Sequence, residues 1–159
     1  SQKNWARKIN DKERKKAIRS ALAASIDKKY VIMRFHKIPA NYPFALDDSF
    51  EKIDKTKKAN QAFAKIGLGD EIKRVAVKKI RAGVGKTRGR KYVKKSGPLV
   101  IVQGSCNLLK SARNIAGFEV IEVQSLNAEK LAPGSMPGRL VLFTENALKH
   151  MAQKKLWGN

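Results

Sequence analysis

Four consecutive apolar residues, Leu99 to Val102, follow a strongly basic stretch of the chain and predict a strand that is buried on both faces. Segments typical of strands and helices then alternate to the end of the chain. Further strands are expected at 118–123 and 140–143, and helices at 105–117, 127–131 and 144–153. Because parallel strands need long crossover connections, this alternation predicts an α/β fold: three layers, with a mainly parallel open sheet flanked by helices.

The first half of the chain adds further elements to this pattern. Apolar residues recur at steps of three and four between residues 11 and 26, which is typical of an amphipathic helix. Residues 30–35 are rich in β-branched and aromatic side chains and predict a short strand. A second helix is expected at 48–67, where Asp48 and Glu51 match a capping box.

The charge of the chain restricts its partners. Lys and Arg outnumber Asp and Glu by 35 to 13 in 159 residues, a formal net charge of +22. Between Glu71 and Glu119, 47 residues contain 13 cations and no carboxylate, and a second basic stretch covers residues 3–19. Such an excess repels itself in a compact state. It therefore favours a polyanionic partner, nucleic acid ahead of acidic membranes and acidic proteins.

Most of these cations fall in a glycine-containing basic loop, residues 73–97, within a single α/β domain expected at 10–159; residues 1–9 form a basic extension. Its glycines allow close approach of the backbone, its arginines present forks for phosphate oxygens, and Tyr92 offers a ring for an unpaired base. The residues predicted to contact RNA are Lys78, Lys79, Arg81, Lys86, Arg88, Arg90, Lys91, Lys94 and Lys95, together with Lys15, Lys16 and Arg19 in the first helix.

The string GVGKT at 83–87 resembles the end of a phosphate-cradling loop, which suggests a nucleotide-dependent enzyme as an alternative. The full pattern needs another glycine, separated from the Gly-Lys pair by four residues, and Ile80 stands there. It also needs an apolar strand before it and an apolar helix after it, whereas both flanks are rich in Lys and Arg. RNA binding is therefore the favoured interpretation.

Other chemistry has little support in the sequence. One cysteine, Cys106, and two histidines, His36 and His150, exclude a disulfide scaffold and a zinc finger. No catalytic residue, metal site or cofactor is predicted, and His36 is expected to be solvated or to contact RNA. No apolar run approaches the roughly 20 residues of a membrane span, and no signal peptide is recognised, which favours a cytoplasmic protein without membrane contact.

Several motifs resemble the universal large-subunit ribosomal protein four family, in its archaeal and eukaryotic branch. They are KKAIRSALAAS from Lys15, KIRAGVGKTRGRKY from Lys79, SARNIAGFEVIEV from Ser111 and LNAEKLAPGSMPGRLVLFTENAL from Leu126. The resemblance covers roughly residues 5–152 and concerns the C-terminal portion of the family's chain. Val84, Thr87 and Met136 depart from the residues common in the family.

The resemblance implies a structural constituent of the large ribosomal subunit that binds ribosomal RNA and supports subunit assembly and translation, without enzymatic activity. The implied partners are large-subunit ribosomal RNA and neighbouring large-subunit proteins, in the cytoplasmic ribosome, with no homo-oligomer. By position, Arg81, Lys86, Arg88, Arg90 and Lys91 inherit an RNA-binding role. The family's tunnel-lining arm precedes the matched portion, so that role passes to no residue here. An RNA chaperone or regulator outside the ribosome is a further alternative.

Overall fold

The computed structural model describes residues 2–5 and 7–157, and within them four parallel strands form one sheet. The order across this sheet is β1 (Ala45–Leu46), β6 (Val141–Thr144), β4 (Leu99–Val102) and β5 (Glu119–Glu122). In the register of the central strands, Val100 lies beside Val120 on one side and Leu142 on the other. The parallel sheet expected from the alternation of strands and helices is confirmed.

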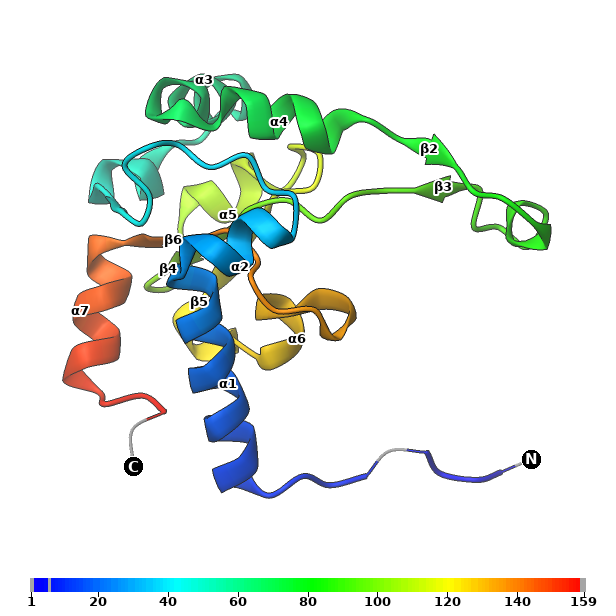
Figure 1. Ribbon diagram of the computed structural model, residues 1–159. Helices are drawn as coiled ribbons and strands as arrows, with labels where there is room; N and C mark the ends of the chain where they lie inside the picture. The colour runs from blue at the N-terminus through cyan, green and yellow to red at the C-terminus, as the bar shows by residue number, and fades with distance from the viewer. Residues whose placement is uncertain (1, 6, 158–159) are drawn as a thin grey trace.

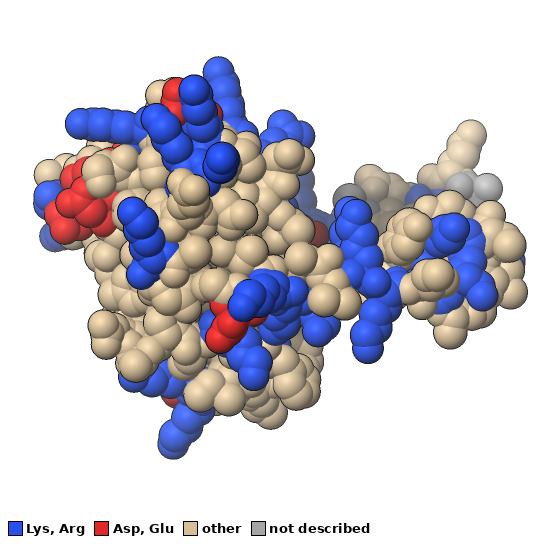
Figure 2. All heavy atoms as spheres, turned by 90° about the horizontal axis from the view of Figure 1, so that it is seen from above, with Lys and Arg blue, Asp and Glu red and all other residues tan. Residues whose placement is uncertain are grey.

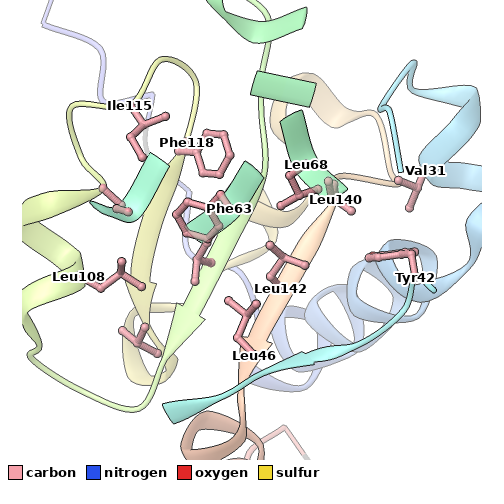
Figure 3. Close-up of a cluster of buried hydrophobic side chains, with 14 residues drawn as sticks. Val31, Tyr42, Leu46, Phe63, Leu68, Leu108, Ile115, Phe118, Leu140 and Leu142 are labelled. Atoms are coloured by element: carbon pink, nitrogen blue, oxygen red, sulfur yellow. The ribbon is translucent and has the colours of Figure 1, made fainter. Parts of the chain in front are cut away.

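Successive residues of the central strands belong to two different hydrophobic cores. Val100, Val102 and Leu142 pack in one cluster, which also contains Phe63 and Phe118 (Figure 3). Leu99 and Ile101 belong to the other cluster, which is closed by Ile18, Leu131 and Ala147. Because side chains alternate across a strand, both faces of the sheet are covered, and this explains why the run from Leu99 to Val102 is apolar without interruption.

Helices cover both faces of the sheet (Figure 1). One face is covered by α1 (Asp11–Ile26), α6 (Ala128–Leu131) and α7 (Glu145–Gln153), and the other by α2 (Lys28–Met33), α3 (Thr56–Phe63) and α5 (Asn107–Ser111). The expected α1 and α7 are confirmed. Thr144 caps α7 as expected, because its hydroxyl accepts a hydrogen bond from the backbone N–H of Ala147 at 3.3 Å.

The strand expected at 30–35 is wrong, since this segment contains α2 instead. The Asp27 side chain accepts a hydrogen bond from the Lys29 backbone N–H and starts the helix directly after α1. Only Val31 is buried among its residues, while the other large apolar side chains face outward. A cap and a tertiary contact therefore override the β propensity of this segment.

The single helix expected at 48–67 is also wrong. A short 3-10 helix (Asp48–Lys52) comes first, capped by Asp47 instead of Asp48, and α3 follows after a break. Glu51 does not complete a capping box, because its carboxylate accepts a hydrogen bond from the Thr144 hydroxyl at 2.7 Å. The chain then bends at Gly67, where φ is 90°, and continues as α4 (Gly69–Ala76).

After α4 the chain leaves the body as a two-stranded antiparallel hairpin, residues 77–96, which we call the basic hairpin (Figure 1). Its strands are β2 (Lys79–Ile80) and β3 (Tyr92–Val93), joined through a 3-10 turn (Val84–Lys86). The chain returns to the sheet at β4. The segment expected at 73–97 thus comprises the last turn of α4, the basic hairpin and Gly97.

Candidate nucleic-acid interface

The tip of the basic hairpin is ordered by its own backbone. The Arg81 backbone N–H donates to the Lys91 carbonyl at 2.8 Å, and the Arg90 N–H donates to the Gly85 carbonyl at 3.0 Å. Gly83 and Gly89 both have φ of 75°, a conformation that glycine adopts without steric cost. The glycines identified in the sequence therefore shape the tip, and its side chains remain free to point outward.

The structure brings nine of the twelve predicted RNA-binding residues together on the basic hairpin. All nine are exposed, and among the described residues no carboxylate lies within ion-pair distance of any of them. Figure 2 shows their blue side chains on the projecting hairpin, whereas the red acidic side chains lie on the body. The hairpin is thus a cationic projection whose charges are not neutralised within the described part of the chain.

Two of these side chains also organise the hairpin. The Arg81 guanidinium donates through Nε to the Arg90 carbonyl at 3.1 Å, and a Cβ at position 85 would lie 2.8 Å from Arg81 Cδ. Gly85 therefore makes room for the Arg81 side chain across the tip. Lys91 Nζ lies 5.7 Å from the centre of the Tyr92 ring, within cation–π range.

The root of the basic hairpin is held by a buried carboxylate, Glu71, at the start of α4. Arg74 donates to both of its oxygens at 2.6 and 2.7 Å, and the Lys37 backbone N–H donates to Oε2 at 2.8 Å. The ring Nδ1 of His36 lies 2.6 Å from Oε1. Arg74 also donates to the Ser96 carbonyl at 2.8 Å, which ties the two ends of the hairpin to each other.

Close packing between backbone segments also holds the root of the basic hairpin. The Gly97 N–H donates to the Gly117 carbonyl at 3.0 Å, and a Cβ on Gly117 would lie 2.2 Å from Val75 Cγ1. Arg139 is 3% exposed, and its guanidinium donates to the carbonyls of Gly97 and Lys130 and to Glu119, each at 2.8 Å. The returning strand of the hairpin is therefore fixed to the sheet before it enters β4.

The three remaining predicted residues, Lys15, Lys16 and Arg19, lie apart from the basic hairpin. They are exposed on α1, whose first half extends downward from the body in Figure 1, whereas the hairpin projects to the right from the top. The two basic stretches of the sequence thus form two separate surfaces.

The expectation that His36 is solvated or contacts RNA is wrong, because His36 is 4% exposed and bound to Glu71. No sequence pattern predicted the three residues that position the hairpin, Glu71, Arg74 and Arg139. Glu71 carries one signal that could have identified it, since it is the last carboxylate before the 47-residue stretch without any.

The string GVGKT lies at the exposed tip of the basic hairpin, between two antiparallel strands of two residues each. A phosphate-cradling loop connects a buried strand to a helix N-terminus, which points backbone N–H groups and the helix dipole at the phosphates. The tip offers neither element. Its shape therefore does not support the nucleotide-dependent alternative.

Among the described residues, no three His, Cys, Asp or Glu side chains are grouped closely enough to hold a metal ion. None of the described helices has the length and apolar character required to span a membrane.

Burial and hydrogen bonds shift the pKa values of two groups at the root of the basic hairpin, Glu71 and His36. Burial opposes ionisation of Glu71, but hydrogen bonds from Arg74, His36 and the Lys37 backbone outweigh it and lower the pKa of this carboxyl to about 2. Burial lowers the pKa of His36, and its hydrogen bond to Glu71 compensates only in part. Glu71 is thus a carboxylate and His36 a neutral imidazole in the folded protein at neutral pH.

Acidification should therefore destabilise the protein in two stages. The unfolded chain takes up protons at His36 below about pH 6.5 and at a glutamate below about pH 4.5, whereas the folded state does so only at lower pH. The free energy of unfolding is then highest above about pH 6.5 and decreases as the pH falls towards about 2. Urea unfolding at several pH values measures this decrease. A decrease between about pH 6.5 and 5 that is unchanged in a His36→Gln variant would contradict the assignment to His36.

The chain is similar to known proteins along nearly its whole length. The model of the ribosomal protein L4/L1 family matches residues 1–154. Large ribosomal subunit protein uL4 of Nanoarchaeum equitans is 44% identical over 158 residues, which cover 99% of this chain and 59% of that protein. The protein of the same name from Methanocaldococcus jannaschii is 42% identical over 152 residues, which cover 94% of this chain and 60% of that protein. The chain thus spans about three fifths of the length of these relatives.

Proposed function

Because this chain belongs to the ribosomal protein L4/L1 family, we propose that it is a structural constituent of the large ribosomal subunit that binds ribosomal RNA and supports subunit assembly and translation. The resemblance inferred from the sequence motifs is confirmed by this membership. The proposed partners are large-subunit ribosomal RNA and the neighbouring large-subunit proteins, in the cytoplasmic ribosome, with no homo-oligomer and no membrane contact.

The observation that carries the RNA-binding proposal is the basic hairpin with its nine cations. An exposed cation without a carboxylate partner has no intramolecular ion pair to give up when it meets a phosphate. Neutralising phosphates also releases the counterions condensed on RNA, which supplies most of the affinity of such surfaces. Because the side chains of the hairpin are exposed, contact with RNA is the role that best explains its composition.

The body of the protein supports this role by fixing the direction of the hairpin. We propose that residues 10–159 form one RNA-binding domain, with residues 1–9 as a basic extension. Within this domain the contacts of Glu71 and Arg139 hold both ends of the hairpin, so that its cations meet RNA in a defined register. Phosphate contacts of this kind position a protein on RNA without reading its base sequence.

The cations of α1 form a second proposed contact, because Lys15, Lys16 and Arg19 are exposed on a helix that lies apart from the hairpin. Two separate basic surfaces suit a protein that lies between RNA segments better than one that binds a single isolated helix. The family role is structural, and we propose that the chain has no enzymatic activity, catalytic residue, metal or cofactor.

Sedimentation tests the assignment to the large subunit. We expect the tagged chain, expressed in an archaeal cell, to sediment with the large subunit and to remain there in high salt, because a protein assembled among RNA segments is held on several sides. Recovery of the chain only in the soluble fractions, or on the small subunit, would contradict the proposal. Release at moderate salt with RNA binding intact would favour an RNA chaperone or regulator outside the ribosome.

A further inference from the structure

Beside the root of the basic hairpin lies a pocket of about 620 Å³, and Lys95 is the one predicted RNA-binding residue in its lining. Its wall combines apolar side chains from the end of α2 with cations from three segments. The residues important here are Ile32, Phe35, His36, Lys37, Arg74 and Lys95. The pocket therefore joins the end of α2 to the returning strand of the hairpin.

Phe35 is the unusual member of this wall. Its side chain is 81% exposed, and its backbone has φ of 63°, a region that bulky residues rarely adopt. Its N–H donates to the Ile32 carbonyl at 2.8 Å, as part of the turn that ends α2. Glycine or asparagine ends a helix in this conformation at lower cost, so neither the turn nor the core accounts for phenylalanine here. An exposed aromatic ring held by a strained backbone points to a binding role.

The cations that line the pocket differ in whether they are already bonded to other groups of the protein. Arg74 is held by Glu71 and Ser96, whereas Lys37 and Lys95 are exposed and form no ion pair with a described carboxylate. The carboxylate nearest to this wall in the hydrogen-bond network, Glu71, is fully buried and neutralised by Arg74. The mouth of the pocket is therefore positive, and two exposed cations without a carboxylate partner line it together with the exposed aromatic ring of Phe35.

We propose that this pocket binds one unpaired nucleotide of RNA, with its base stacked on Phe35 and its phosphate bound by Lys37 and Lys95. The proposal rests on the RNA-binding function proposed above and names a contact within it. Bases of unpaired nucleotides stack on exposed aromatic side chains, and lysines bind the adjoining phosphates. Lys95 also belongs to the basic hairpin, so an RNA strand that follows the hairpin passes this mouth.

The charge of the pocket favours RNA over a protein as the occupant. A protein segment that used Ile32 and Phe35 would need to bring acidic groups to Lys37 and Lys95 at the same time. RNA supplies a flat apolar surface and a negative charge within every nucleotide. The pocket volume lies in the range of sites that hold small molecules.

The test measures binding of the full chain to transcribed large-subunit ribosomal RNA. Phe35→Leu, which keeps an apolar side chain but cannot stack, should weaken binding roughly 5- to 150-fold, while Phe35→Tyr should bind as the original chain does. Because stacking releases no counterions, Phe35→Leu should leave the salt dependence of binding unchanged. Lys37→Gln and Lys95→Gln should each reduce the slope of log affinity against log salt by about 0.7.

A second variant keeps the test independent of folding. Phe35→Gly removes the backbone strain and should keep or raise the melting temperature while weakening RNA binding as much as Phe35→Leu does. Equal RNA affinity of Phe35→Leu and the original chain would overturn the nucleotide pocket. If these variants kept RNA affinity but sedimented less completely with the large subunit, a neighbouring protein would occupy the pocket instead. Failure of the original chain to bind RNA would contradict the proposed function itself.

Discussion

Replacing Lys86, Arg88 and Arg90 together by glutamine should weaken binding to large-subunit ribosomal RNA about a hundredfold at about 100 mM salt. These cations lie at the tip of the basic hairpin, exposed and without a carboxylate partner among the described residues. Each phosphate contact contributes roughly 0.7 to 0.9 to the slope of log affinity against log salt, so the slope should fall by about 2 to 3. Arg81 is left unchanged because its side chain braces the tip.

The matched control removes the same number of positive charges from outside the proposed RNA-binding surfaces. Lys57, Lys65 and Lys154 are exposed on the body, outside the proposed RNA-binding surfaces, and their replacement by glutamine lowers the net charge by the same three units. We expect this variant to retain most of the affinity and both variants to keep the original melting temperature. Equal losses of affinity in the two variants would mean that net charge alone, and not the hairpin, governs binding.

Glu71→Gln should lower the free energy of unfolding by about 3 to 5 kcal/mol, the cost of removing one partner from a buried ion pair. Glu71 is fully buried and accepts hydrogen bonds from Arg74, His36 and the Lys37 backbone, whereas a glutamine can accept through only one oxygen and carries no charge. Urea unfolding of the variant and the original chain measures this difference.

A neighbouring carboxylate provides the control for Glu71. Asp70 precedes it in the first turn of α4 and pairs with Lys73 at 3.6 Å, but its side chain is 81% exposed. Asp70→Asn should therefore cost less than about 1 kcal/mol. A similar small cost for Glu71→Gln would mean that the root of the hairpin is not held by this carboxylate. If Glu71→Gln folds at low temperature, its RNA affinity should also fall, because the hairpin loses its fixed direction.

The parts of the fold that the sequence predicted correctly are those with a strong periodic pattern. β4 is apolar throughout because both its faces are covered, and α1 repeats its apolar residues at helical spacing, so both could be recognised locally. The helix α2 has six residues and depends on the cap from Asp27, which residue propensity does not show. The helical segment at 48–67 is interrupted because Glu51 binds Thr144, a residue 93 positions away.

In the candidate site, too, the features with a local signal in the sequence could be predicted, and those that depend on distant contacts could not. Charge and glycine content identified the cations of the basic hairpin, but its strands have only two residues each and show no periodic pattern. The role of Glu71 depends on His36, which lies 35 residues away, and on a backbone N–H, so no local motif reveals it. The pocket at Phe35 depends on a positive φ after a helix that the sequence did not indicate.

One carboxylate contacts two segments that would otherwise be independent. Glu71 binds Arg74 at the base of the hairpin and also His36 and the Lys37 backbone next to Phe35. This carboxylate therefore holds the base of the hairpin close to the backbone beside Phe35, and an RNA that used both proposed contacts would have to match the spacing between them. RNA molecules with the same base sequence but a different junction angle would reach either the hairpin or the Phe35 pocket and miss the other. Selection of this kind would depend on RNA geometry, and it would rely on the contacts that hold the root of the hairpin, the buried Glu71–Arg74 ion pair among them.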